Sequence, residues 1–570
     1  MKKIYPTTFV LLLILALSFT VQAAPPLDQH ERIQREQQRL MEMERRQQEL
    51  EQILKRPPGE DLKQEQTMSA PEGGACILIN ELALQGNTVF SAGEIDAVFA
   101  RYRGQCLTMI RMNALLQDIT NLYIEKGYVT SRAFMVMPQN RLKEGILEVF
   151  IVEGRINSLK GIGSGAIFTA FPGMKGKVLN LRDIEQGVSQ INRLPSNRAV
   201  IDIKPAEDRD GYSDIIINNE PDGRYRFGLF TDNAGSKLTG EWRTGGRISL
   251  DNLLRGNDQI NISYAKAPAE DYNHRDSNAV TAGINVPLGY WTFNYNFSYS
   301  DYMVSFILPF SNERYHSYGS SYVNNGSIDR VISRGQNYTV SLSGGLTRRN
   351  SKNYSRVADV TVKNDPSSRV LTVLNFDLPI TFYPPAGILY VKPGFVRGVR
   401  MLRALDDRTS PYSQKAQYSA GKLYGYYAFN YRAAMFTTSV EGQYSKDELY
   451  SSEAFSIGGE YSVRGFRLDS AQGDTGFSIR NDVSFSLNRL FASDNPLLTM
   501  FTPGVFIDYG HVRSNTLGSG RTDLSGAGAK MHFGYKYFAA SATYAGVISR
   551  KEGMKDRHAW YLYAGANISF

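Results

Sequence analysis

The 570-residue chain is poor in cysteine, in long apolar runs and in charge of one sign. It has only two cysteines, and past residue 23 no apolar run is long enough to cross a bilayer as a helix. Its 64 Lys and Arg and 56 Asp and Glu leave a net charge of +8 without a basic block, so nothing indicates a nucleic-acid partner. The six histidines are scattered, and there is no HExxH motif, nucleophile elbow or P-loop. We therefore expect no enzymatic activity, no metal site and no cofactor.

Residues 1–23 have the pattern of a secretory signal sequence. A positively charged start precedes an apolar stretch over residues 9–19, and Val21-Gln22-Ala23 fits a cleavage site. No cysteine follows this site, so a lipid anchor is not expected there. In an exported, oxidising compartment, Cys76 and Cys106 are expected to form a disulfide. Two free, buried thiols are the alternative.

Residues 24–58 form a polar segment that is expected to be helical. From Asp28 to Arg56, Gln, Glu and Arg dominate, and Pro57-Pro58 ends the pattern. At 1.5 Å per residue such a helix would be roughly 43 Å long, about the thickness of a bilayer with its headgroups. It is too polar for lipid, so it is either a plug in a water-filled barrel or a solvated tether or coiled coil. Residues 59–74, which are polar with Pro and Gly, are predicted to be a linker.

Two small α/β modules are predicted next, over residues 75–154 and 155–221. In the first, the pattern predicts a strand over residues 77–84, a helix after the capping box Ser91-x-x-Glu94, a helix over residues 113–126, and strands over residues 129–138 and 145–152. The second repeats this plan in shorter form, with a helix over residues 181–193 and strands over residues 200–204 and 212–217. The exposed edges of such small sheets can accept an extended polypeptide by strand addition.

Residues 222–570 have the pattern of a transmembrane β-barrel, so the fold class is expected to be mainly β. The chain is rich in Tyr (34), Phe (29) and Gly (51), and its strand-like segments alternate apolar and polar side chains. Between Trp291 and Tyr299 the odd-numbered residues are aromatic and the even-numbered ones polar, so one face would contact lipid and the other would line a wet lumen. About 22 residues per strand and connection predict 16 strands, although fourteen or eighteen also fit. The chain ends on Phe570, the residue type with which outer-membrane barrels usually end.

One arginine and one aspartate in this region are candidates for an internal ion pair. Arg464 lies in Val463-Arg464-Gly465-Phe466, and Asp508 lies in Phe506-Ile507-Asp508-Tyr509-Gly510, where a wall strand is expected. If both side chains face the lumen, the pair would hold a loop inside the pore, because a charge-assisted Arg–Asp pair is directional and costly to break where water is restricted. The alternative is a surface loop and an unrelated acidic residue in a strand.

Further short motifs occur in both modules and at the start of the barrel. The first module contains Gly86-Asn87-x-x-Phe90, Tyr123-x-x-x-Gly127-Tyr128 and Glu144-Gly145-x-Leu147…Val152-Glu153-Gly154, and the second contains Asn192-Arg193-Leu194-Pro195-Ser196. The barrel begins with Asp232-Asn233-x-Gly235 and Thr239-Gly240. Together with the Arg464 and Asp508 motifs, they resemble the outer-membrane transporters of two-partner secretion, whose modules are polypeptide-transport-associated (POTRA) domains. The cysteine pair resembles the branch that serves haemolysins and contact-dependent inhibition toxins.

The resemblance covers nearly the whole mature chain and implies a function. The protein would lie in the bacterial outer membrane, with its POTRA domains in the periplasm. It would export one large, unfolded, β-helical exoprotein (a haemolysin, an adhesin or a contact-dependent inhibition toxin) and, as some haemolysin transporters do, activate it. The POTRA domains would bind the N-terminal secretion domain of that partner. The polar helix would plug the lumen, and Arg464 would pair with Asp508.

Further expectations concern membrane insertion, the oligomeric state, alternative functions and three single residues. The barrel-assembly machinery would insert the chain into outer-membrane lipid, and a closed barrel would be a monomer because it has no free edge. An insertase for other barrels is the alternative function, and a passive porin is a second alternative. His511 is expected to be an ordinary loop or lumen residue, and Arg348 and Arg349 are expected to be solvated charges at the rim.

Overall fold

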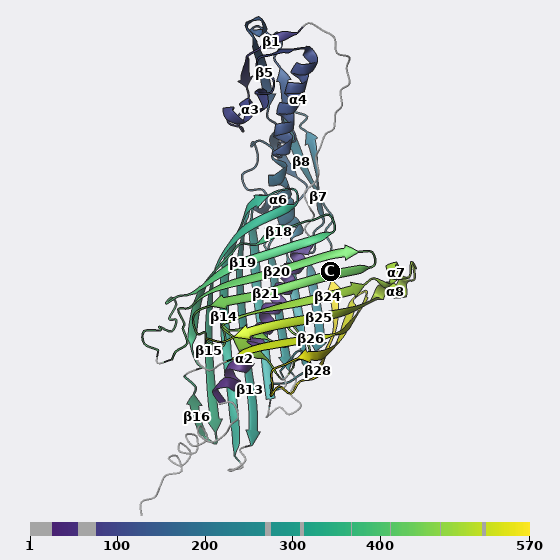
Figure 1. The fold of residues 1–570 in the computed structure, drawn as a ribbon. Coiled ribbons are helices and arrows are strands. Elements are labelled where there is room, and N and C mark those ends of the chain that lie inside the picture. Colours follow the sequence, from purple (N-terminus) through teal and green to yellow (C-terminus); the bar gives the residue numbers. More distant parts are fainter. Residues whose placement is uncertain are drawn as a thin grey trace, which may run out of the picture.

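The computed structural model describes residues 26–54 and 76–570, except for Lys237, residues 268–274 and 308–312, Pro366, Pro411, Leu468 and residues 516–519. The predicted signal sequence and the predicted linker over residues 59–74 lie outside the described residues. Two α/β modules are stacked on one end of a closed barrel, and helix α2 (Pro26–Leu54) runs inside the barrel (Figure 1). We call the end that carries the modules the module end and the opposite one the far end.

The described residues form a closed antiparallel barrel. Its strands are β9 (Tyr225–Asp232), β10 (Arg243–Asp251), β11 (Gln259–Ala267), β12 (Arg275–Leu288), β13 (Trp291–Ile307), β14 (Arg314–Arg334), β15 (Tyr338–Val357), β16 (Val360–Lys363), β17 (Val370–Asp377), β18 (Ile380–Phe382), β19 (Gly387–Gly398), β20 (Ser419–Tyr431), β21 (Ala434–Ser445), β24 (Thr475–Phe485), β25 (Phe501–Arg513), β26 (Arg521–Tyr535), β27 (Phe538–Ser549) and β28 (His558–Ser569). Strands β16, β17 and β18 pair with successive parts of one edge of β15. Together they occupy a single strand position in the barrel wall. β28 pairs with β9 and closes the wall. The predicted barrel of 16 strands is thereby confirmed.

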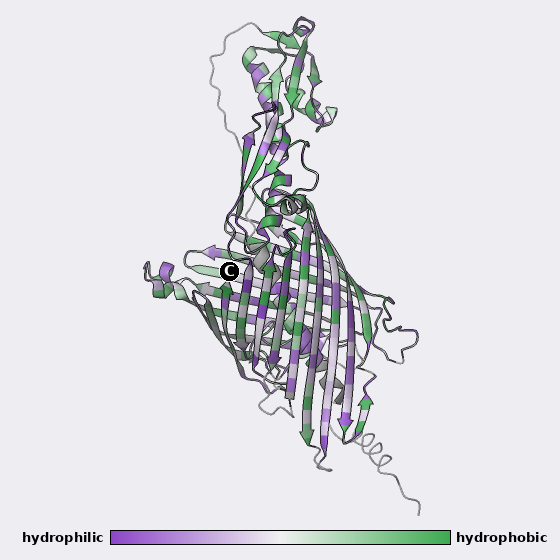
Figure 2. Ribbon diagram, turned by 180° about the vertical axis from the view of Figure 1, so that it is seen from behind, coloured by the Kyte–Doolittle hydropathy of each residue, from purple (hydrophilic) through white to green (hydrophobic). Residues whose placement is uncertain are grey.

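Side chains alternate between the outside and the lumen along the wall strands, as a strand period of two requires. In β25, Val505, Ile507 and Tyr509 are exposed on the outside, whereas Phe506 and Asp508 are buried on the lumen side. Apolar and polar residues alternate in the same way along the other wall strands (Figure 2). The expected apolar outer face and polar lumen are therefore present.

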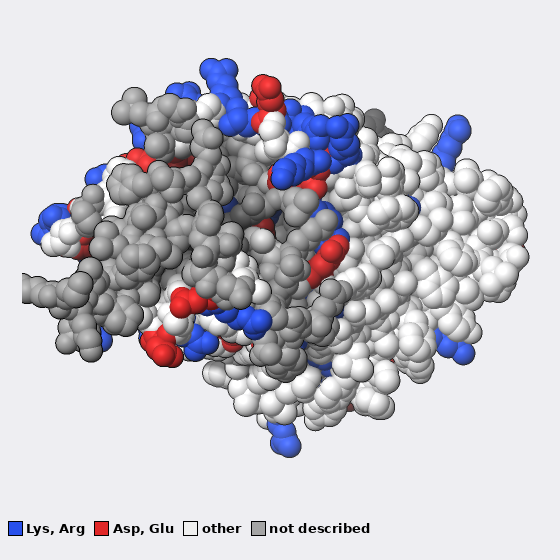
Figure 3. All heavy atoms as spheres, turned by 90° about the horizontal axis from the view of Figure 1, so that it is seen from below, with Lys and Arg blue, Asp and Glu red and all other residues white. Residues whose placement is uncertain are grey.

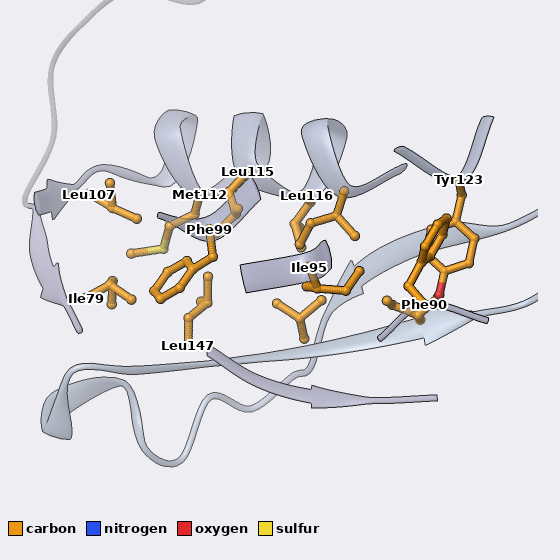
Figure 4. Packing of buried hydrophobic residues seen from close by; sticks show 13 residues of the cluster. Ile79, Phe90, Ile95, Phe99, Leu107, Met112, Leu115, Leu116, Tyr123 and Leu147 are labelled. Atoms are coloured by element: carbon orange, nitrogen blue, oxygen red, sulfur yellow. The ribbon is translucent and has the colours of Figure 1, made fainter. Parts of the chain in front are cut away.

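The first module is built around one small sheet. Its elements are β1 (Ile77–Ile79), β2 (Glu81–Gln85), α3 (Ala92–Phe99), β3 (Gln105–Leu107), α4 (Met109–Glu125), β4 (Arg132–Met135), the 3-10 turn η1 (Leu142–Glu144) and β5 (Ile146–Val152). β2, β5 and β4 form the sheet, and both helices cover its inner face, where Phe99, Leu115 and Leu147 lie together in the core (Figure 4). β1 pairs with β3, beside the expected disulfide between Cys76 and Cys106.

Some elements of this module differ from those predicted from the sequence. The single strand predicted over residues 77–84 is wrong, because the chain divides at Asn80 into β1 and β2, which belong to different sheets. The backbone N–H groups of Asn80 and Glu81 both donate to Gly145 O, at 2.8 and 3.2 Å, so the chain turns there. The second helix begins at Met109 rather than residue 113, because Thr108 caps its first turn.

The second module joins the first to the barrel. It contains β6 (Arg155–Lys160), α5 (Ser164–Ala170), α6 (Leu181–Asn192), β7 (Ala199–Pro205) and β8 (Tyr212–Asn219), with β8 in the middle of the sheet. The predicted helix and both predicted strands are present, and β6 and α5 are additional. The remaining elements are β22 (Phe455–Ile457), β23 (Ala471–Gly473), α7 (Leu487–Leu490) and α8 (Pro496–Met500). No helix among the described residues is both long and apolar enough to cross a membrane.

Candidate functional site in the barrel lumen

Residues 446–474, which connect β21 and β24, fold back into the lumen, and we call them the lumen loop. The structure describes all of them except Leu468. Its β22 and β23 pair as a short hairpin. Between them, Val463 and Phe466 are fully buried against Val512 of β25 and Leu524 of β26. The motif that contains Arg464 is therefore held against the inner face of the wall.

Two wall carboxylates bind the guanidinium of Arg464. Its Nε and Nη2 donate to Oδ2 and Oδ1 of Asp508, both at 2.7 Å, and its backbone N–H donates to Asp508 Oδ2 at 3.0 Å. Its Nη1 and Nη2 also donate to Asp482 of β24, at 2.9 and 3.1 Å. Asp482 accepts a further bond from Lys530 Nζ at 2.8 Å. The structure thus brings Arg464 and Asp508 together and adds Asp482; we call the three residues the Arg464 clamp.

The neighbouring motif residues make room for this clamp. The Arg464 guanidinium lies 3.5 Å from the centroid of the Phe506 ring, a distance that allows a cation–π contact. A Cβ at Gly510 would lie only 2.8 Å from Val463 Cγ2, so a larger residue there would push the loop off β25. Gly465 has a φ of +109°, a conformation that residues with a side chain rarely adopt.

Backbone groups of the loop are bound by the last strand and by the connection before it. Gly465 N–H donates to Tyr561 Oη at 3.3 Å, and Tyr561 Oη donates to Phe466 O at 3.1 Å. Arg467 N–H donates to Asp556 Oδ2 at 2.7 Å. Sequence reasoning missed Tyr561 and Asp556, as it missed Asp482 and Lys530. For Tyr561, Asp482 and Lys530 the available signal was a charged or polar residue at a lumen-facing position of a wall strand, whereas Asp556 lies in the connection between β27 and β28 and had no such signal.

Three other residues differ from expectation or refine it. Arg349 is not a solvated rim charge; it faces the lumen and forms an ion pair with Glu453 of the lumen loop. Arg348, one residue earlier, is partly buried, and its Nε donates to Leu402 O in the loop that follows β19. His511 lies neither in a loop nor in the lumen, because in β25 it alternates with buried residues and its Nδ1 is 2.9 Å from the exposed Asp523 Oδ1.

Helix α2 binds the wall through polar side chains. Gln34 Nε2 donates to Asn353 Oδ1 of β15 at 2.9 Å, and Gln38 Nε2 donates to Ser321 Oγ of β14 at 3.0 Å. Ile33 is fully buried against the wall. The polar composition of this helix therefore matches a polar lumen rather than lipid.

The same helix also binds the lumen loop and the opposite wall. Arg39 Nη1 donates to Gly458 O at 3.0 Å. Arg46 forms an ion pair with Glu441 of β21 and lies 4.8 Å from the centroid of the Tyr424 ring. A cavity of about 640 Å³ remains between α2, α6 and the wall. Seen from the far end, basic and acidic residues gather around the rim, beside a broad wall surface with few charges (Figure 3).

The Asn-Arg-Leu-Pro-Ser motif at the end of α6 fastens the second module to the barrel. Arg193 donates to Asn257 O in the β10–β11 turn and to Asn285 Oδ1 in β12. The backbone N–H of Ser196 donates to Asp251 Oδ2 of β10 at 3.1 Å. These contacts fix the end of the second module over the mouth of the barrel.

The motifs of the first module meet in one buried network. Tyr123 Oη lies 2.8 Å from Asn87 Oδ1 and 3.0 Å from Glu153 Oε1. The Glu153 carboxylate also accepts from the backbone N–H of Thr88 at 2.7 Å, and the Tyr123 and Phe90 rings meet edge to face at 4.6 Å. These motif residues therefore hold the module together.

Comparisons with known proteins agree over most of the chain. The family "Haemolysin secretion/activation protein ShlB/FhaC/HecB" matches residues 211–533, and two POTRA-domain families match residues 77–154 and 154–205. The outer membrane transporter CdiB of Dickeya dadantii is 32% identical over 85% of this chain and 84% of that protein. The hemolysin transporter protein ShlB of Serratia marcescens is 29% identical over 84% of each. The solved structure of CdiB from Escherichia coli superposes with a TM-score of 0.84 at 28% identity, over 96% of this chain and 100% of that one.

The closed barrel, the two POTRA domains and the occupied lumen define an outer-membrane transporter with its POTRA domains in the periplasm. The chain belongs to the haemolysin secretion/activation protein family ShlB/FhaC/HecB. It is a transporter of two-partner secretion, as the resemblance predicted. The module end of the barrel is therefore the periplasmic end, and the far end is the extracellular end.

Proposed function

We propose that this transporter exports one large exoprotein in an unfolded state, and that α2 and the lumen loop keep the pore closed until that partner arrives. The POTRA domains bind the N-terminal secretion domain of the partner in the periplasm. The partner is a haemolysin, an adhesin or a contact-dependent inhibition toxin, and the cysteine pair of the first POTRA domain favours the first or the last. Activation of the partner during export would be a further step.

The observation that carries this proposal is that two separate segments occupy the lumen and differ in how they are held. Helix α2 is held by single hydrogen bonds that water can replace, such as those of Gln34 and Gln38, and by the partly exposed ion pair of Arg46 with Glu441, so its release should cost less than release of the Arg464 clamp. Arg464 is only 4% exposed and is bound by two carboxylates, so its release would leave buried charges without partners. We therefore expect α2 to move first and the Arg464 clamp to hold the wall while the partner passes.

A secretion assay tests this proposal. The chain is expressed together with the large exported protein encoded beside it, and that protein is measured in the medium and in the periplasm. The intact transporter should bring the partner into the medium. Arg464→Ala should insert as a barrel but lose most of the secretion, whereas Arg348→Ala, which removes a partly buried arginine that faces away from the lumen, should not.

Each other result has a definite meaning. Export that proceeds without this chain would refute dedicated secretion. A general loss of outer-membrane proteins after deletion of the chain would support the insertase, and a large steady conductance without an exported partner would support the porin. If secretion needs the chain but tolerates Arg464→Ala, the proposal of dedicated secretion would stand. The Arg464 clamp would then have a structural role only.

Three smaller proposals accompany the main one. The transporter is a monomer, because pairing of β28 with β9 leaves no free barrel edge for a second copy. The barrel-assembly machinery inserts it into the outer membrane, and the chain itself catalyses no reaction. Measurement of the particle mass in nanodiscs checks the first point: a mass of two chains would contradict it.

A further inference from the structure

The turn between β24 and β25 differs from its neighbours at the periplasmic end. It carries α7 and α8, whereas the turns between β20 and β21 and between β26 and β27 consist of only two residues each. In two opposite views this turn projects sideways from the barrel wall, away from the lumen (Figures 1 and 2). We call residues 486–500 the α7–α8 hairpin.

Backbone hydrogen bonds order the hairpin, but its apolar side chains are exposed. Asn495 Oδ1 accepts from Leu497 N–H at 3.0 Å and thereby caps α8, and Phe491 N–H donates to Leu487 O at 3.0 Å in α7. The side chains of Leu490, Phe491 and Leu497 are nevertheless 54, 63 and 59% exposed. Such a cluster on a short, ordered projection would be costly in water, because contact of apolar side chains with water raises the free energy.

This cluster continues the lipid-facing surface of the barrel. Phe501, the first residue of β25, and Phe533 of β26 face outward at the periplasmic end, with ring centroids 5.2 Å apart. Tyr535 and Phe538 are exposed beside them. Helix α8 packs on β25 and β26, so the hairpin begins where this aromatic band ends.

Cationic side chains lie beside aromatic rings at the same end of the barrel. Lys536 Nζ lies 5.3 Å from the centroid of the Tyr535 ring, and the guanidinium of Arg432 lies 5.4 Å from that of Tyr431. The hairpin also carries a cation, because Arg489 is exposed and precedes the exposed Leu490 and Phe491 in the sequence. Aromatic rings with adjacent Lys or Arg mark the depth of lipid headgroups, where an apolar body and a charged tip are both accommodated.

We propose that the α7–α8 hairpin is an interfacial anchor that lies in the phospholipid headgroup layer of the periplasmic leaflet. Leu490, Phe491 and Leu497 insert at the boundary between headgroups and acyl chains, and Arg489 binds lipid phosphates. The occupant is phospholipid rather than a protein, because the cluster is continuous with the lipid-facing wall. The hairpin joins the two strands that carry Asp482 and Asp508, so it also fixes the depth at which the Arg464 clamp sits in the membrane.

Depth-dependent fluorescence quenching tests this anchor. Both native cysteines are in the disulfide, so a single introduced thiol can be labelled. The full chain with Phe491→Cys is labelled with a polarity-sensitive dye and placed in vesicles of phosphatidylethanolamine and phosphatidylglycerol. Quenchers are a spin label on the headgroup, a spin label near the chain end, and aqueous iodide. Val505→Cys, on the lipid-facing side of β25, and Glu207→Cys, on an exposed loop of the second POTRA domain, are the matched lipid and water controls.

The label at residue 491 should be quenched more strongly by the headgroup spin label than by the chain-end one. Its quenching by iodide should be several-fold weaker than at residue 207. In the same background, Arg489→Gln should reduce the headgroup quenching when phosphatidylglycerol is present and have little effect without it. Iodide quenching equal to that at residue 207 would place the hairpin in water and overturn the proposal. Shielding from iodide and from both lipid quenchers would mean that protein covers the hairpin, and it would overturn the proposal equally.

Discussion

At the scale of single residues, the two carboxylates that bind Arg464 are not equivalent. Asp508 is fully buried and accepts three bonds, including the backbone N–H of Arg464. Asp482 is partly exposed and is shared with Lys530. Asp508→Asn should therefore weaken the clamp by about 3 kcal/mol, since it leaves a buried charge under-compensated, whereas Asp482→Asn should cost about 1 kcal/mol. Trypsin cleavage of the lumen loop after Arg464 or Arg467 in the inserted barrel measures the difference.

The two variants control for each other, because each replaces one wall aspartate by its neutral isostere. Faster cleavage in Asp508→Asn than in Asp482→Asn is the expected order. The opposite order would show that Asp482, with Lys530, carries the clamp and that the shorter contacts to Asp508 matter less.

A second residue-scale prediction concerns Tyr123 in the first POTRA domain. Burial, and then the hydrogen bond with Glu153, raise the pKa of the Tyr123 hydroxyl above its ordinary value of 10.0. The folded domain therefore keeps this proton after the unfolded chain has begun to lose it. The stability of the domain should be unaffected by this group below pH 10 and should fall as the pH rises above it. Urea unfolding, followed by circular dichroism at concentrations that leave the barrel folded, measures this slope.

Tyr123→Phe separates the hydrogen bonds of this residue from its ring. The variant should lose about 1–2 kcal/mol of domain stability at neutral pH, because Glu153 and Asn87 each lose a partner in a buried network. The stability of the variant should also decline less steeply above pH 10, because the contribution of the Tyr123 hydroxyl is absent. An unchanged alkaline slope would assign that slope to other residues.

Arg464 and Asp508 could be singled out from the sequence because both lie in compact motifs with glycine or aromatic neighbours, but only the family resemblance implied that they pair. The sequence was insufficient for Asp482, which occupies an ordinary lumen-facing position in β24 with no local pattern around it. Which wall residue meets a loop depends on strand register and on the path of the loop through the lumen. Arg349 was misjudged for the same reason, because its neighbour Arg348 faces outward and only the register distinguishes them.

At the scale of elements, α2 is held most firmly where its charge is paired. Arg46 binds Glu441 and lies over the Tyr424 ring. Glu441→Gln should loosen this part of the helix by about 1 kcal/mol, since Arg46 remains partly hydrated. In planar bilayers the variant should open more often than the unaltered chain, and deletion of residues 26–54 should open it far more. Equal opening of all three would mean that α2 does not close the pore.

The contact between α6 and the barrel gives another prediction at this scale. Arg193, the C-cap of α6, is buried and binds two separate barrel elements, whereas Arg182 at the start of α6 forms an ion pair with Glu185 of the same helix. Arg193→Ala should broaden the distance distribution between spin labels on β8 and on β12, and Arg182→Ala should not. Equal distributions in the two variants would show that other contacts of the second domain suffice to hold it.

Element boundaries were predictable where a helix has caps or a strand has a strict alternation. Helix α6 and strands β7 and β8 lie close to their expected positions for this reason. The division between β1 and β2 was not predictable, because both are apolar and only the hydrogen bonds of Asn80 and Glu81 to Gly145 separate them. The inward path of the lumen loop likewise depends on wall residues far away in sequence.

At the scale of the whole molecule, the barrel and the first POTRA domain are stabilised by different means. Apart from the short β16, which pairs with β15, the barrel strands that the structure describes are paired on both sides, so the closed part of the wall has no edge at which unfolding can begin. The first POTRA domain has a small core and a disulfide that closes a sequence separation of 30 residues. In the chain-entropy account, such a loop contributes about 3–4 kcal/mol.

Reduction of the disulfide, or Cys76→Ser with Cys106→Ser, should therefore lower the urea midpoint of the first POTRA domain and leave the heat-resistant electrophoretic mobility of the barrel unchanged. The paired substitution avoids a free thiol, so disulfide exchange does not complicate the comparison. Because the second domain lies between the first domain and the barrel in the described part of the chain (Figure 1), secretion should fall with the fraction of unfolded POTRA domain, while insertion of the barrel stays constant. A barrel that loses its heat resistance in the same variant would show that the domains and the wall fold as one cooperative unit.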